Sequence, residues 1–111
     1  LGAWWKQSRG LPLPLGGNAI RRDLAGVAPD LCRVLLNSIH YALDHREEAV
    51  EYALYYARDM GIDLACRFVG MYVNDWTLDY GDAGRESIRR FLWRGHKMGV
   101  VPALPELEFV E

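Results

Sequence analysis

The sequence predicts a mostly helical segment, with about four helices and one or two short strands. Apolar residues recur at the 3.6-residue period of a helix over most of the chain after residue 28. The stretch 10–23 instead alternates leucine with proline and continues into glycines, which is incompatible with a helix. One isolated strand cannot satisfy its own backbone groups. We therefore expect its partner sheet to lie outside this chain.

The composition is that of a folded protein without a strong charge bias. The chain has 111 residues, which suits one small domain or part of a larger one. Its net charge of −2 gives no electrostatic case for nucleic acid or an acidic membrane surface. No apolar run approaches the roughly 20 residues of a membrane helix, and no signal-peptide pattern is present. Cys32 and Cys66 are isolated in predicted helices, which favours reduced thiols. We expect a cytoplasmic protein.

Residues 1–8 predict a short helix that ends at Gly10. Trp4 and Trp5 are adjacent, and neighbouring side chains on a helix cannot face the same way. We expect one indole to be buried and the other to be partly exposed or to cover another part of the protein.

The stretch 10–23 has two prolines, which cannot donate backbone hydrogen bonds and push their predecessors towards extended geometry. Gly16 and Gly17 allow close backbone approach or positive φ, and Asn18 adds an amide that donates and accepts. Two interpretations remain open from these residues. One is a surface loop that leads into an edge strand, and the other is a hinge-like crossing that lines a cleft.

Four longer helices are expected in the rest of the chain. They span residues 29–43, 46–60, 64–73 and 82–98. The apolar face of the first is broad, so we expect that helix to lie between other elements. Asp44 and His45 compete as the N-cap of the second helix, and Asp63 is expected to cap the third. Residues 74–81 predict a loop, and residues 100–111 an extended tail that packs back through Leu107, Phe109 and Val110.

The residue pattern contains no complete catalytic or metal site. His40 and Asp44 are four residues apart on a helix, which is typical of a surface pair. Ser38 and His40 point away from each other, which excludes a nucleophile–base pair. His45 is explained as a cap, and His96 by the favourable position of a cation near a helix C-terminus. No spacing of His, Cys or Asp fits zinc.

Two charged or glycine-rich features each have two interpretations. The Gly81–Gly84 segment at a helix start is explained by capping or by anion binding. Arg89, Arg90 and Arg94 form a basic stripe, which is a solvated face or an interaction patch.

Several motifs together resemble one family, the 1,4-dihydroxy-6-naphthoate synthases of the futalosine route to menaquinone. The motifs are Leu1-Gly2-Ala3-Trp4-Trp5, Gly10-Leu11-Pro12-Leu13-Pro14-Leu15-Gly16, Arg21-Arg22-Asp23-Leu24, His45 followed by Glu47-Glu48-Ala49, and Tyr72-Val73-Asn74 with Leu78-Asp79 and Gly81. The resemblance runs across essentially the whole chain, and the leucine–proline run is its most specific part. Chorismate dehydratase, the sister enzyme, is similar at the start, but we expect it to lack the second proline and the glycine of Pro14-Leu15-Gly16.

The resemblance implies a periplasmic-binding-protein-like type II fold, with two α/β lobes and a cleft between them. It implies a lyase of menaquinone biosynthesis that converts cyclic dehypoxanthinyl futalosine to 1,4-dihydroxy-6-naphthoate without a metal or organic cofactor. The family's catalytic base is a histidine, and none of His40, His45 and His96 matches it. We therefore expect a C-terminal segment whose base precedes Leu1 and which is inactive alone.

The resemblance also places the stretch 10–23 between the lobes. The residues expected to bind substrate are Pro14, Leu15, Gly16, Gly17 and Asn18. The expected division is 1–28 for the short helix and crossing strand, 29–99 for the helical part and 100–111 for the tail. The expected partners are the small-molecule substrate and either a missing N-terminal lobe or a second copy in a homodimer. The alternatives are a solute-binding-type module without the chemistry, or chorismate dehydratase.

Overall fold

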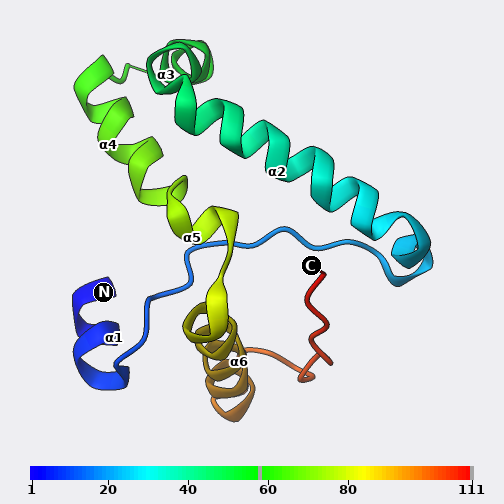
Figure 1. Ribbon diagram of the computed structural model, residues 1–111. Coiled ribbons are helices and arrows are strands. Elements are labelled where there is room, and N and C mark those ends of the chain that lie inside the picture. Colours follow the sequence, from blue (N-terminus) through cyan, green and yellow to red (C-terminus); the bar gives the residue numbers. More distant parts are fainter. Residues whose placement is uncertain (58, 111) are drawn as a thin grey trace. The chain divides into compact units, whose positions relative to one another are not determined.

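The computed structural model describes residues 1–57 and 59–110, and this part of the chain contains six α-helices, one 3-10 helix and no strand (Figure 1). The chain divides into two compact units. Unit 1 comprises Leu1–Ala19 with Tyr80–Val110, and unit 2 comprises Ile20–Asp79. The three-part division expected from the sequence stays a prediction.

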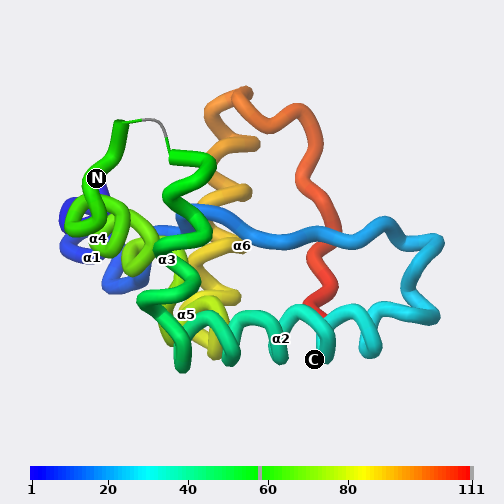
Figure 2. Tube along the Cα trace, turned by 90° about the horizontal axis from the view of Figure 1, so that it is seen from above, coloured from blue at the N-terminus to red at the C-terminus, as the bar shows by residue number. Residues whose placement is uncertain are grey.

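The expected α/β class is wrong for the described residues, because every regular element among them is a helix. The stretch between Gly10 and Arg21 is extended, as expected, and runs without a helical turn in the tube of Figure 2. It is not a strand, because a strand requires a neighbour that pairs with its backbone groups, and its prolines remove two donors. The expected periplasmic-binding-protein-like fold, which is built on sheets, is therefore not supported.

In unit 1, helix α1 (Gly2–Arg9) ends at Gly10, whose φ of 69° is the left-handed conformation that glycine favours. The Trp5 ring is 5% exposed and meets the ring of Phe91 on α6 (Gly81–Lys97) edge-on, at 5.7 Å between centroids. Trp4 is 54% exposed. The prediction that the two indoles lie in different environments is confirmed.

Helix α6 ends in a Schellman motif that turns the tail back along the helix. Gly99 has φ 74°, its N–H donates to the carbonyl of His96, and the N–H of Val100 donates to that of Gly95. Gly95 also allows close approach of the tail, because a Cβ there would lie 2.9 Å from Cγ2 of Val101. The tail then brings Phe109 to 6.3 Å from the ring of Tyr80, and its predicted return is confirmed for Phe109.

Unit 2 is a chain of short and long helices. They are η1 (Arg22–Val27), α2 (Ala28–Asp44), α3 (Arg46–Leu54), α4 (Ile62–Tyr72) and α5 (Asp75–Leu78). Helix α2 packs against η1, α3 and α5, and α3 packs against α4. The buried apolar side chains of this unit, among the described residues, are those of Ala28, Val50 and Ala65, and of these Val50 is fully buried.

Two expected boundaries in unit 2 are wrong. Helix α3 ends at Leu54 instead of residue 60, because the next N–H groups bond to carbonyls three residues back, in the tighter 3-10 pattern that does not continue the α-helix. Residue 58 of the expected range lies outside the described residues. The N-cap of α4 is Gly61, so Asp63 lies inside the helix and does not cap it.

The loop expected at residues 74–81 contains helix α5. The side chain of Asn74 accepts a hydrogen bond from the N–H of Trp76, and the hydroxyl of Thr77 accepts one from the N–H of Asn74. This reciprocal pairing is a capping box. Four residues are too few for a periodic apolar pattern, so the capping residues are the only sequence signal for this helix.

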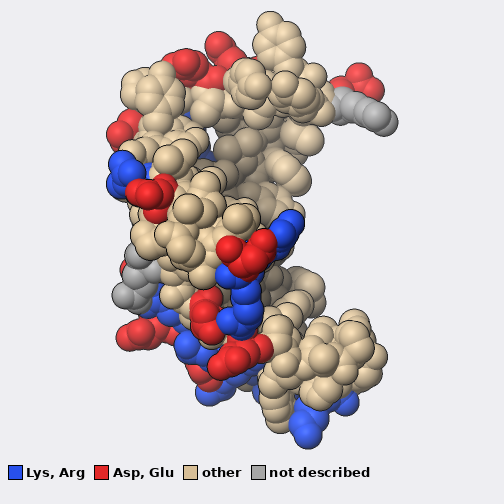
Figure 3. All heavy atoms as spheres, turned by 90° about the vertical axis from the view of Figure 1, so that its right-hand side faces the viewer, with Lys and Arg blue, Asp and Glu red and all other residues tan. Residues whose placement is uncertain are grey.

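On the one face drawn in Figure 3, acidic and basic side chains are interspersed, with uncharged areas between them. No helix in residues 1–57 and 59–110 is long and apolar enough to cross a membrane.

Candidate functional site

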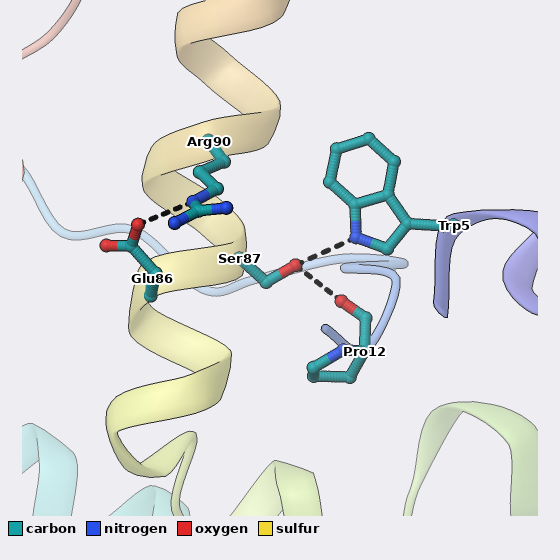
Figure 4. A network of polar contacts seen from close by, with 5 residues as sticks. All are labelled: Trp5, Pro12, Glu86, Ser87 and Arg90. Atoms are coloured by element: carbon teal, nitrogen blue, oxygen red, sulfur yellow. Dashed lines mark hydrogen bonds and ion pairs between the residues drawn. The ribbon is translucent and has the colours of Figure 1, made fainter. Parts of the chain in front are cut away.

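The extended segment 10–19 of unit 1 is held in place by Ser87 of α6 (Figure 4). The indole Nε1–H of Trp5 donates to Ser87 Oγ at 3.1 Å. Ser87 Oγ in turn donates to the backbone carbonyl of Pro12 at 2.5 Å. One hydroxyl therefore connects α1, the extended segment and α6.

The chemistry of this network requires a small hydroxyl side chain. Ser87 is 1% exposed, and a hydroxyl can accept from one group while it donates to another. The Trp5 N–H is buried, so it needs an acceptor inside the protein. On the outer side of α6, Arg90 pairs with Glu86 at 2.7 Å, but both side chains are about half exposed and the pair is weak.

The five expected substrate-binding residues follow this anchor directly. Pro14 is half-buried, Leu15 is 49% exposed, and Gly16, Gly17 and Asn18 are exposed. The structure thus presents them along one continuous extended stretch. Their role in binding stays a prediction.

Neither backbone conformation nor close packing in unit 1 requires glycine at positions 16 and 17. Neither Gly16 nor Gly17 has a positive φ, contrary to one of the two uses expected for them. A Cβ at Gly16 would meet nothing within 4 Å, and one at Gly17 would be 3.5 Å from Tyr80 Oη, which is an ordinary contact. Close approach of another molecule to the backbone is the remaining use for which a glycine pair is suited.

A concave feature of unit 1 lies between α6 and the tail. It has a volume of about 350 Å³, and it is lined by Arg89, Arg90, Trp93, Leu104, Pro105 and Leu107. The sequence pattern did not predict it, because helical periodicity carries no information on where the tail returns. Arg89 lies over the ring of Phe109 at 5.2 Å, so the expected solvated stripe is partly engaged in packing.

The three histidines form no catalytic pair with a nucleophile in the described residues. His40 is exposed on α2. A ring nitrogen of His45 lies 3.0 Å from the carbonyl of Tyr41, and one of His96 lies 3.0 Å from that of Val101. His45 stands at the N-cap position of α3, but its side chain makes no capping hydrogen bond, contrary to expectation.

The charged pairs of unit 2 are surface features. The hydrogen bond from Arg21 lowers the pKa of the Asp23 carboxyl, and the same contact raises the pKa of Arg21. The negative charge of Glu48, 3.2 Å from Tyr41 Oη, raises the pKa of that phenol. These groups are exposed, so they are surface contacts rather than tuned acids or bases. Within residues 1–57 and 59–110, no three His, Cys, Asp or Glu side chains gather at metal-binding distance.

Comparison with known proteins gives a consistent set of matches. Residues 1–97 match a family model described as menaquinone biosynthesis. The chain is 37% identical to the 1,4-dihydroxy-6-naphthoate synthase of Thermus thermophilus, over 99% of this chain and 41% of that protein. It is 37% identical to the enzyme of the same name from Streptomyces coelicolor, over 94% of this chain and 37% of that protein. The chain thus spans about two fifths of the length of these relatives. No solved structure matches it significantly.

Proposed function

This chain belongs to the menaquinone biosynthesis family, and on that premise we propose that it forms part of a 1,4-dihydroxy-6-naphthoate synthase. The observation that carries the proposal is the pair of relatives with this name, from two organisms, each 37% identical over 94–99% of the chain. The proposed reaction is the lyase step that converts cyclic dehypoxanthinyl futalosine to 1,4-dihydroxy-6-naphthoate. The proposed compartment is the cytoplasm.

We propose that activity also needs polypeptide equivalent to the rest of the relatives. The chain covers 41% of the Thermus thermophilus protein, which leaves about three fifths of that protein without a counterpart here. In the described residues, His45 and His96 are engaged with backbone carbonyls and His40 is exposed, and no nucleophile pairs with them. The 111-residue chain alone is therefore expected to be inactive.

Residues 14–18 are proposed to position the substrate. Gly16 and Gly17 leave the backbone accessible to a flat ring system, and the Asn18 amide donates to and accepts from polar groups of the ligand. The bond from Ser87 to the Pro12 carbonyl fixes the start of this stretch. A site that is positioned by buried hydrogen bonds keeps its geometry before the ligand arrives.

A full-length chimera tests the function directly. In it, this chain replaces the 41% of the Thermus thermophilus enzyme that it matches. The chimera should release 1,4-dihydroxy-6-naphthoate from cyclic dehypoxanthinyl futalosine, measured by liquid chromatography, and the 111-residue chain should not. A folded chimera that dehydrates chorismate instead would identify the sister activity, and one that binds the futalosine without turnover would indicate a binding module.

One substitution in the chimera tests the role of residues 14–18. Asn18→Ala should lower kcat/KM roughly tenfold or more, because a hydrogen bond to the ligand is lost. Asn37→Ala, at another exposed asparagine, on α2, should leave kcat/KM unchanged. Equal rates in the two variants would remove Asn18 from the site.

A further inference from the structure

Helix α2 of unit 2 has three faces of different chemistry. At 100° per residue, its side chains fall into three groups along the helix. The inner face packs within unit 2 and consists of Ala28, Cys32, Leu36, Ile39 and Leu43. The polar face consists of Asp30, Arg33, Asn37, His40 and Asp44. The third face, here called the outer stripe, consists of Leu31, Val34, Leu35, Ser38 and Ala42.

The three large apolar side chains of the outer stripe are exposed, whereas Ala42 is half-buried. Leu31 is 43% exposed, Val34 60% and Leu35 47%. None of its five residues is charged, whereas the neighbouring polar face carries most of the charge of the helix. A continuous apolar stripe of this kind on a helix is typical of a surface that packs against a core or a partner.

Helix α4 of the same unit has a similar stripe. Its exposed apolar side chains are Leu64, Phe68, Met71 and Tyr72, at 57, 49, 50 and 46% exposure. The buried apolar side chains of unit 2, among the described residues, are those of two alanines and Val50. The unit therefore leaves most of its large apolar side chains outside its own core.

The relatives indicate what covers the outer stripe. They align with nearly all of this chain, and in them the aligned segment is joined to a longer part of the same polypeptide. We infer that the outer stripe of α2 is the docking surface for polypeptide equivalent to that longer part, carried in the same chain or in a separate one. The inference rests on the proposed function for the identity of the occupant, and on the exposed apolar side chains for the surface.

Thiol labelling in the full-length chimera tests the surface without removing it. The native Cys32 and Cys66 are replaced by Cys32→Ala and Cys66→Ser, and Val34→Cys then places a single thiol on the outer stripe. A maleimide should modify this thiol at least tenfold more slowly in the chimera than in the 111-residue chain. The matched control is Asn37→Cys on the polar face of the same helix, which should react at similar rates in both proteins.

Each outcome supports or overturns the inference. Equal labelling of the Val34→Cys thiol in the chimera and in the chain would overturn it. Protection that appears in the chain alone and grows with its concentration would identify a second copy as the occupant and would also overturn it. A chimera without cooperative unfolding would contradict it too, because the surfaces would then not fit.

The same chimera separates this inference from the proposed function. Protection of the Val34→Cys thiol in a chimera that does not turn over the futalosine would leave the docking surface standing and remove the function. Turnover by a chimera whose Val34→Cys thiol is unprotected would support the function and overturn the docking surface.

Discussion

The hydroxyl of Ser87 makes two hydrogen bonds at once, one to the indole of Trp5 and one to the carbonyl of Pro12. Replacing it by Ser87→Ala leaves the buried Trp5 N–H without an acceptor, which costs about 1–3 kcal/mol. The variant should therefore lower the free energy of unfolding in urea by that amount, monitored by tryptophan fluorescence. Ser8→Ala, at an exposed serine of α1, should change it by less than about 0.5 kcal/mol.

A second variant isolates the hydrogen bond from the loss of the side chain. Trp5→Phe removes the donor, and combining it with Ser87→Ala should cost less than the two single effects added together, because both remove the same bond. Strict additivity in this double-mutant cycle would mean that Trp5 and Ser87 are not coupled.

The backbone conformation at position 99 favours glycine. Its φ of 74° lies in the left-handed region, and a Cβ there would meet nothing within 4 Å, so the cost of a side chain is conformational only. Gly99→Ala should reduce the free energy of unfolding by about 1–2 kcal/mol. Gly99→Asn should recover part of it, because asparagine tolerates this conformation. Thermal unfolding of both variants measures the difference, and equal melting temperatures for Gly99→Ala and the parent would contradict the assignment.

Single residues were predictable from the sequence where the signal is local. Gly10 was expected to end its helix, and it does so with the conformation that glycine favours. Ser87 was not singled out, because its two partners lie 82 and 75 residues away along the chain. No periodicity or spacing rule connects residues so far apart. The expected binding residues 14–18 could be placed on the segment, but their chemistry depends on a ligand.

At the scale of elements, the capping of α5 is a local device that decides whether a short helix forms. Four residues gain little from helix propagation, so their stability depends on the hydrogen bonds of Asn74 and Thr77. The Asn74 amide also donates to the carbonyls of Gly70 and Met71 at the end of α4. Asn74 therefore connects two helices.

Substitution of Asn74 should destabilise both the end of α4 and the start of α5. Asn74→Ala should cost about 1–2 kcal/mol of unfolding free energy and should speed amide hydrogen exchange at Trp76 and Thr77. Asn74→Asp keeps the acceptor and loses the donors, so its effect should be intermediate. The matched control is Asn37→Ala on α2, and an exchange rate at Trp76 that does not respond to Asn74→Ala would contradict the role of the cap.

The helices themselves were largely predictable from apolar period, and their limits less so. The expected range 29–43 agrees closely with α2 (Ala28–Asp44), because a long amphipathic pattern and Pro29 define it. Helix α3 stops at Leu54 although its apolar period continues. The end is set by hydrogen bonds to carbonyls three residues back, such as that from the N–H of Tyr56 to the carbonyl of Ala53. The apolar pattern of the sequence gives no information on these backbone hydrogen bonds.

At the scale of the whole molecule, the sequence predicted helices correctly and the fold class incorrectly. The alternation in residues 11–15 is compatible with a strand, but a strand forms only against a neighbour, and the described residues provide none. The sequence pattern did, by contrast, predict the broad apolar surface of α2. It predicted a helix with other elements on more than one side. Within the described part of unit 2, α2 packs against η1, α3 and α5, but Leu31, Val34 and Leu35 stay exposed.

Substitutions on the outer stripe of α2 should affect stability differently in the 111-residue chain and in the full-length chimera. The triple substitution Leu31→Gln, Val34→Gln and Leu35→Gln keeps good helix formers and replaces exposed apolar side chains. In the 111-residue chain it should leave helicity and the free energy of unfolding nearly unchanged, and it should reduce binding of the dye ANS. In the full-length chimera it should lower the free energy of unfolding by about 2–4 kcal/mol, since the remaining burial of three aliphatic side chains is lost.

The control for this prediction is a second triple substitution on the polar face of the same helix. Asp30→Gln, Arg33→Gln and Asn37→Gln should change the free energy of unfolding by less than about 1 kcal/mol in both proteins, because these exposed groups contribute little. Circular dichroism with urea titration measures all four variants. If the outer-stripe triple destabilised the chain and the chimera equally, the stripe would be part of the internal packing of unit 2. If it destabilised neither, the stripe would remain in water in the larger protein as well.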